Sequence, residues 1–206
     1  MSVIFDWSGV VKDAMSAHFW VVNRIFKKYG VKEIPFKELR AGWVEPFMMF
    51  YNKYLPEMTI EEERSDYKEF MQMSDYPEAK IYLGIGDLLR KLKNNNCFLA
   101  VVSADFKNIL ETEINNFGLV NIFDEIVTDT HDKTTAVQEL IDKYNLDKNR
   151  TFFVGDSVGE IEVSRKLEIK SVAVTWGLSS EVSLKNEKPD FLAHDVKELA
   201  GILRLD

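Results

Sequence analysis

The chain has 206 residues, 46% of them hydrophobic, and a formal net charge of -8. This length allows one core of about 140 residues with an insertion. The acidic balance argues against a nucleic-acid or anionic-membrane surface and favours small-molecule chemistry. Cys97 is the only cysteine, so the chain cannot form an internal disulfide. Because neither a signal peptide nor a membrane span is evident, we expect a cytoplasmic protein. We expect it to be a monomer or a homodimer.

The first predicted element is a buried strand in VIFDWSGVV, residues 3–11. An unpaired buried carboxylate is costly, so we expect Asp6 at the strand's carboxyl end, where open α/β sheets bind their ligands. Gly9 lets the chain turn sharply there. Asp6 is therefore a candidate nucleophile or metal ligand, and the alternative is an ordinary turn aspartate.

Residues 14–79 are predicted to be helical. The helical period is clear over 14–29 and 44–54, and a capping box of Thr59 and Glu62 predicts the start of an acidic helix. The prolines of this segment fit helix starts and connections. We therefore predict a helical domain, residues 14–79, inserted into an α/β core formed by residues 1–13 and 80–206.

From residue 80 onward, short apolar strands alternate with amphipathic helices. Helices are predicted at about 84–94, 105–117, 133–145 and 158–167, and the strands are CFLAVV, EIVT, TFFVGD and SVAVTW. A last apolar piece, 190–193, is predicted to be an edge strand before a C-terminal helix. This alternation predicts an α/β fold with a doubly wound, mostly parallel sheet.

Polar side chains follow the predicted strands where a parallel sheet would gather them into one crevice. They are Asp6, Ser103, Lys133, Asp156 and Glu160. Three of them have an ordinary alternative. Lys133 opens a helix and could be a solvated lysine, Ser103 could cap the helix near 105, and Asp156 could initiate a helix. Their recurrence at successive strand ends favours a shared site.

These motifs, in this order and with the insertion after the first, resemble the haloacid dehalogenase superfamily of aspartate-nucleophile phosphohydrolases. The resemblance covers nearly the whole chain and implies a Rossmann-like core with a helical cap. It makes Asp6 the nucleophile that forms an aspartyl phosphate. Ser103, beside Ala104 in the phosphate-binding site, would hydrogen-bond a phosphoryl oxygen, and Lys133 would neutralise the nucleophile and the transferring group.

The resemblance also implies a Mg2+ cofactor. Its ligands would be Asp6, the backbone carbonyl of Ser8, Asp156 and Glu160, the last directly or through water. A dianionic phosphate repels a carboxylate nucleophile, so such a site needs cationic groups on both sides, which a hard metal ion and an ammonium supply. The sequence thus predicts a Mg2+-dependent phosphohydrolase that acts on a small phosphorylated metabolite.

Ser8 departs from the family pattern, in which a second aspartate protonates the leaving group and then activates water. Loss of this acid–base assistance is worth roughly 100- to 10,000-fold, so we expect a slower enzyme and not an inactive one. The loss should matter most for alkoxide leaving groups and least for acyl, anhydride or aryl phosphates. Ser8→Asp should accordingly favour alkyl phosphates.

Substrate choice in capped members lies in the cap. The candidate specificity loop contains Arg40, Gly42, Trp43 and Glu45, with Arg40 and Trp43 as expected substrate contacts. His18 matches a hinge histidine of the phosphoglucomutase-like branch and is a further candidate contact, although an ordinary helix histidine is an equal alternative.

Three other functions are weighed from the sequence. The Asp6–Trp7 pair resembles phosphonoacetaldehyde hydrolases, which form a Schiff base with a cap lysine, but Lys37 and Lys53 lie off the expected register. True haloacid dehalogenases carry a tyrosine where Ser8 stands. A phosphate-binding or regulatory protein with negligible turnover is the alternative outside the enzymes.

Overall fold

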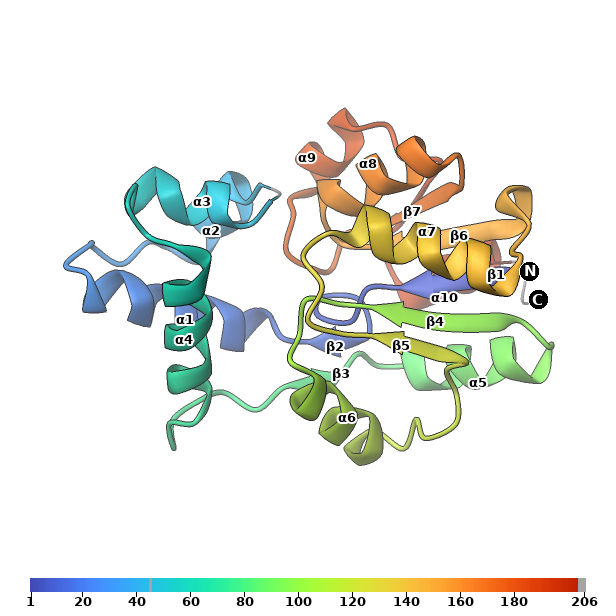
Figure 1. The fold of residues 1–206 in the computed structure, drawn as a ribbon, viewed down its shortest axis with the longest axis horizontal. Coiled ribbons are helices and arrows are strands. Elements are labelled where there is room, and N and C mark those ends of the chain that lie inside the picture. Colours follow the sequence, from blue (N-terminus) through green and yellow to red (C-terminus); the bar gives the residue numbers. More distant parts are fainter. Residues whose placement is uncertain (45, 204–206) are drawn as a thin grey trace.

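The computed structural model describes residues 1–44 and 46–203, and its centre is a six-stranded sheet of order β5-β4-β1-β6-β7-β8 (Figure 1). All neighbouring strands are parallel, which confirms the predicted doubly wound α/β fold. The strands are β1 (Ser2–Phe5), β4 (Phe98–Val102), β5 (Glu125–Val127), β6 (Thr151–Gly155), β7 (Lys170–Val174) and β8 (Phe191–Ala193).

Helices cover both faces of the sheet because β1 is apolar on both sides. Val3 and Phe5 pack into a core with α5 and α6, whereas Ile4 packs on the opposite face with α7 and α8. Figure 1 shows these two helical layers on either side of the strands. The helices are α5 (Ile85–Asn94), α6 (Lys107–Asn116), α7 (Lys133–Tyr144), α8 (Val158–Leu167), α9 (Glu181–Asn186) and α10 (Val196–Ile202), with a 3-10 turn at Lys148–Arg150.

Four helices between the first and fourth strands stand apart from the sheet (Figure 1). This helical unit contains α1 (Met15–Lys28), α2 (Phe36–Gly42), α3 (Met48–Tyr54) and α4 (Ile60–Met71). It has a hydrophobic core of its own, to which Phe26, Phe50 and Phe70 contribute. None of the described helices has the length and hydropathy needed to cross a bilayer.

In this unit the predicted start of α4 is confirmed, whereas the predicted start of α3 is wrong. Thr59 and Glu62 form the expected capping box, in which the Glu62 amide donates to Thr59 Oγ1 at 3.2 Å. The helix expected over 44–54 begins only at Met48, because Pro46 cannot donate within a helix and its carbonyl instead accepts from the Met49 amide. The seven-residue α2 was not anticipated.

Two short strands join the helical unit to the sheet. β2 (Lys12–Asp13) pairs antiparallel with β3 (Lys80–Ile81), so the chain leaves and re-enters the α/β core at one place. Two-residue strands carry no readable period, which is why the sequence did not reveal them. Lys12, the first residue of β2, is only 2% exposed.

Candidate active site

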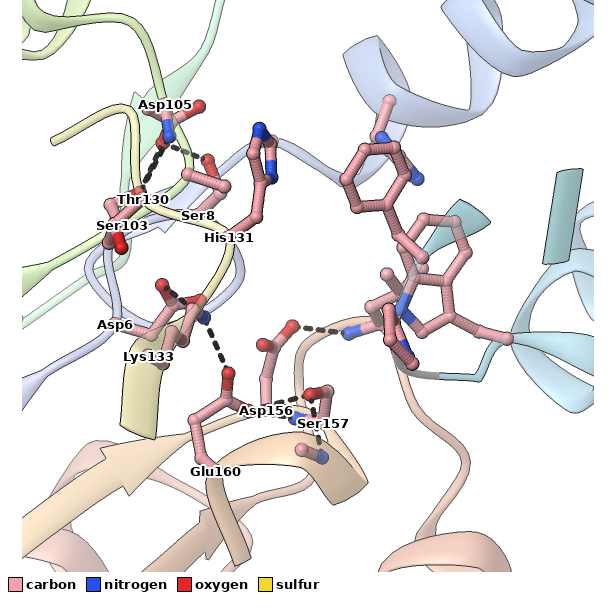
Figure 2. Close-up of a pocket in the computed structure, with 18 of the residues that line it drawn as sticks. Asp6, Ser8, Ser103, Asp105, Thr130, His131, Lys133, Asp156, Ser157 and Glu160 are labelled. Carbon is pink, nitrogen blue, oxygen red and sulfur yellow. Dashed lines mark hydrogen bonds and ion pairs between the residues drawn. The ribbon is translucent and has the colours of Figure 1, made fainter. Parts of the chain in front are cut away.

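The carboxyl ends of β1, β4 and β6 and the start of α7 surround one cavity of about 530 Å³ (Figure 2). This volume lies within the usual range of small-molecule sites. Among the residues that line it are nine candidates identified from the sequence: Asp6, Ser8, His18, Trp43, Ser103, Ala104, Lys133, Asp156 and Glu160. The topology therefore brings together side chains that lie more than 150 positions apart.

Asp6 follows directly on β1 and is 6% exposed. Its amide continues the parallel pairing by donating to the Val154 carbonyl at 2.9 Å, which fixes the backbone at the sheet edge. Its Oδ1 lies 3.0 Å from Lys133 Nζ. Burial raises the pKa of Asp6 to about 6 against the opposing charge of this ammonium. The carboxylate is thus held in place by one defined ion pair.

Lys133 is the first residue of α7, and Asp132 caps this helix by accepting from the Thr135 amide. The helix start aims the lysine back over the sheet edge, where Nζ donates to Glu160 Oε1 at 2.5 Å and also contacts Asp6 (Figure 2). Lys133 is therefore not an ordinary solvated lysine, since its side chain is only 18% exposed.

Asp156 follows β6, and its Oδ2 accepts from the Leu178 amide at 2.7 Å. Two glycines make room for this carboxylate. A Cβ on Gly9, whose φ is +84°, would lie 1.9 Å from Asp156 Oδ2, and a Cβ on Gly177 would lie 2.2 Å from it. Burial, followed by the negative charge of Asp6, raises the pKa of Asp156 well above its ordinary value.

Glu160 uses both carboxylate oxygens within the protein. Oε1 accepts from Lys133, and Oε2 accepts from the Ser157 amide at 2.9 Å and the Ser157 hydroxyl at 2.7 Å. Burial acts to raise the pKa of Glu160, but the ammonium and these hydrogen bonds outweigh it and lower the pKa. Ser157 is the N-cap of α8, so Asp156 is not needed to initiate that helix.

A second polar cluster beside Asp6 escaped the sequence analysis. Asp105 Oδ2 accepts from Ser8 Oγ at 2.7 Å and from Ser103 Oγ at 3.1 Å (Figure 2). Burial acts to raise the pKa of Asp105, but the charge of Lys12 and the two hydroxyls outweigh it and lower the pKa. Ser103 does not cap a helix as one alternative supposed, because α6 begins only at Lys107, after Phe106.

Lys12 connects this cluster to the protein interior. Its Nζ lies 3.6 Å from Asp105 Oδ1 and 3.1 Å from Glu113 Oε1, and the Trp7 indole donates to Glu113 Oε2 at 2.7 Å. A lysine directly after the apolar pair Val10–Val11 was the available signal, since a buried lysine needs anionic partners. Which acids would answer to it depends on the tertiary fold.

The helical unit closes the cavity on the other side. His18 Nδ1 lies 3.2 Å from the Tyr67 hydroxyl, and its ring meets Trp43 edge-on at 4.8 Å. Burial lowers the pKa of His18 to about 4. From α4, the Arg64 guanidinium donates to the Ala104 carbonyl at 2.9 Å. Glu63, also from α4, lines the cavity although the sequence did not single it out.

Arg40 and Gly42 are not brought to this cavity. The Arg40 guanidinium donates to three backbone carbonyls, those of Thr175, Leu178 and Ser179, at 3.0 to 3.1 Å. It therefore ties α2 to the loop after β7. A Cβ on Gly42 would face Phe50 at 3.6 Å, inside the helical unit. Glu45, the remaining member of the expected specificity loop, lies outside the described residues.

The charge balance of the cavity suits a hard divalent cation. Three buried carboxylates, those of Asp6, Asp156 and Glu160, face the ammonium of Lys133, which leaves excess negative charge. Within residues 1–44 and 46–203, no group of three or more His, Cys, Asp or Glu side chains is placed so that it could hold a metal ion by itself. Mg2+ fits such a partial set, because it binds few carboxylates and takes its other ligands from waters and phosphate oxygens.

A doubly wound sheet whose central strands lead into one cavity lined by buried carboxylates, serine hydroxyls and the Lys133 ammonium is typical of an α/β enzyme. The sequence model of the haloacid dehalogenase-like hydrolases matches residues 3–174, and the chain belongs to this family. The resemblance seen in the sequence is thereby confirmed, and the protein is a hydrolase of this family.

Relatives with named activities are similar over nearly their whole length. A phosphoglycolate phosphatase of Synechococcus elongatus is 24% identical over 204 residues, covering 96% of this chain and 94% of the relative. A pyrophosphatase, PpaX, of Oceanobacillus iheyensis is 23% identical over 207 residues, covering 98% and 96%. These similarities support a phosphatase within the family.

Solved structures show the same fold. A haloacid dehalogenase-like family hydrolase from Streptococcus pneumoniae superimposes with a TM-score of 0.83 at 20% identity, covering 98% of both chains. A predicted phosphatase from Clostridium acetobutylicum gives a TM-score of 0.82 at 22% identity, covering 98% of this chain and 97% of the other. The agreement extends over the helical unit as well as the sheet.

Proposed function

We propose that this protein is a Mg2+-dependent phosphohydrolase that uses Asp6 as a covalent nucleophile on a small phosphorylated metabolite. One observation carries the proposal: Asp6, 3.0 Å from the Lys133 ammonium, shares a cavity with Ser103 and Asp156. A carboxylate can attack a phosphate dianion only where positive charge offsets their repulsion. The relatives named as phosphatases support the same reaction.

In this mechanism an Asp6 oxygen forms a bond to phosphorus as the bond to the leaving oxygen breaks, and the leaving group departs with the electron pair. The Lys133 ammonium offsets charge on Asp6 and on the transferring phosphoryl group. The Ser103 hydroxyl, 2% exposed at the cavity wall, donates to Asp105 in the free protein and is proposed to turn this hydrogen bond to a phosphoryl oxygen when substrate binds. Water then releases phosphate from the aspartyl phosphate and restores Asp6.

Asp6, Asp156 and the Ser8 carbonyl are the groups proposed to hold Mg2+. When bound, the ion supplies Lewis-acid polarisation of the phosphoryl oxygens. Glu160 is proposed to act through water, because both of its oxygens already accept hydrogen bonds. Its bond to Lys133 keeps that ammonium directed at Asp6.

The helical unit α1–α4 is proposed to be the cap that encloses the substrate, with the domain limits 14–79 for the cap and 1–13 with 80–206 for the core. His18, Trp43 and Arg64 are its candidate contacts, since all three line the cavity. Among the described residues, the lysines lining the cavity are Lys12, Lys133 and Lys166, none of which comes from α1–α4. This distribution disfavours a phosphonate hydrolase that relies on a cap lysine.

Hydrolysis of para-nitrophenyl phosphate and acetyl phosphate with Mg2+ tests the proposal. We expect turnover that a chelator abolishes and that Asp6→Asn removes, with a phosphorylated Asp6 recovered after rapid quenching. Asp87→Asn, at a side chain 84% exposed on α5, is the matched control. Tight binding of beryllofluoride without turnover of either compound would instead identify a phosphate-binding protein.

A further inference from the structure

We propose that Asp105 is a further catalytic residue of this enzyme. Its carboxylate accepts the proton of the water that hydrolyses the aspartyl phosphate, a task for which Ser8 offers no carboxylate. This inference rests on the proposed covalent mechanism at Asp6. Asp105, which follows β4, thus accepts the proton that a carboxylate at residue 8, after β1, would otherwise accept.

The position of Asp105 carries the argument. Its Oδ2 lies 2.7 Å from Ser8 Oγ, and both residues line the same cavity as Asp6. Figure 2 shows the side chains of Asp105 and Ser8 pointing toward one another, on the same side of the cavity as Ser103. A carboxylate built on residue 8 would extend beyond the serine oxygen into the space that Asp105 fills. The site therefore has one carboxylate in this region, supplied by a different strand.

The surroundings of Asp105 fix that carboxylate in one orientation. The Ser8 and Ser103 hydroxyls both donate to Oδ2, and Lys12 Nζ lies 3.6 Å from Oδ1. Lys12 is held in turn by Glu113 at 3.1 Å. The ammonium and the two hydroxyls together hold the Asp105 carboxylate, whose side chain is 21% exposed, at the cavity wall.

The proposed step balances as follows. A water oxygen forms a bond to phosphorus while the phosphorus–oxygen bond to Asp6 breaks, and the electron pair of that bond returns to the Asp6 carboxylate. One water proton moves to the Asp105 carboxylate and later passes to solvent. Free phosphate leaves, and both aspartates regain their starting state.

Rapid-quench kinetics of Asp105→Asn with para-nitrophenyl phosphate and Mg2+ test this role. The first half-reaction does not use Asp105, so we expect a burst of nitrophenolate at about the wild-type rate. Steady-state turnover should fall roughly 100- to 10,000-fold, and phosphorylated Asp6 should accumulate. The burst amplitude counts folded, active enzyme, so a folding defect cannot imitate this result.

Further variants make the test decisive. Asp87→Asn, at a side chain 84% exposed on α5, is the control and should keep wild-type turnover. The double variant Ser8→Asp with Asp105→Ala empties the space that Asp105 fills and returns a carboxylate to it, and it should turn over about tenfold or more faster than Asp105→Ala alone. Unchanged turnover in Asp105→Asn, or a burst that falls together with turnover, overturns the proposal. Full activity of Asp6→Asn would instead overturn the covalent mechanism.

Discussion

Glu63 gives the fold a stability that depends on pH. Its side chain lies in α4 and is 3% exposed, and burial raises its pKa from 4.5 to about 7 against the opposing charge of Arg64. A carboxyl group with a raised folded-state pKa stabilises the fold only while it is protonated. Its contribution is complete below about pH 4.5 and is lost as the pH rises through about 7.

The size of the effect follows from the pKa. One pKa unit corresponds to about 1.4 kcal/mol, so a rise from 4.5 to about 7 corresponds to about 3 kcal/mol. Glu63→Gln keeps the shape without the charge and should remove this dependence. Relative to wild type, the free energy of unfolding of the variant should therefore increase by about 3 kcal/mol between about pH 4 and pH 8.

Urea unfolding followed by tryptophan fluorescence, without added metal, measures this difference. Glu61→Gln is the control, because Glu61 is an exposed residue on the same helix. A difference between Glu63→Gln and wild type that stays constant across this pH range would refute the reasoning, since it would mean that Glu63 ionises alike in the folded and unfolded chains.

Three other substitutions test the site. Gly9→Ala should weaken Mg2+-dependent activity and lower the unfolding free energy by more than Gly30→Ala, because both glycines have positive φ but only the first would drive a Cβ into Asp156; equal losses would contradict this. Lys133→Met should abolish turnover and destabilise the metal-free protein by about 3 kcal/mol in urea unfolding, since it leaves two buried carboxylates without their ammonium; undiminished turnover would exclude its role. Arg40→Met should lower the unfolding free energy by about 2 kcal/mol, because the hydrogen bonds of Arg40 to three backbone carbonyls are lost. A raised KM with unchanged stability would instead indicate that Arg40 binds substrate.

Much of the architecture could be predicted because it follows from local pattern. The β1 run VIF, buried on both faces, and the alternation of strands and helices after residue 80 specified a parallel sheet, and parallel strands necessarily direct Asp6, Ser103 and Asp156 to one edge. The capping box at Thr59 could also be predicted from local pattern, because its hydrogen bonds join residues only three positions apart.

Contacts between distant segments could not be predicted in this way. From the sequence, Arg40 could be a substrate contact or a structural residue. Only the fold places its guanidinium against the loop after β7. The cluster of Lys12, Asp105 and Glu113 joins residues about 100 positions apart through two-residue strands that carry no period. No local rule pairs such charges.

The sequence by itself determined which strand ends carry reactive groups, because hydrophobic period and strand direction are properties of each segment. Only the tertiary structure decided which charges face one another, because burial and distance arise when the segments pack. Residue 8 shows the difference most clearly: the family resemblance implies a carboxylate where this sequence has Ser8, and only the folded chain places the Asp105 carboxylate against that serine.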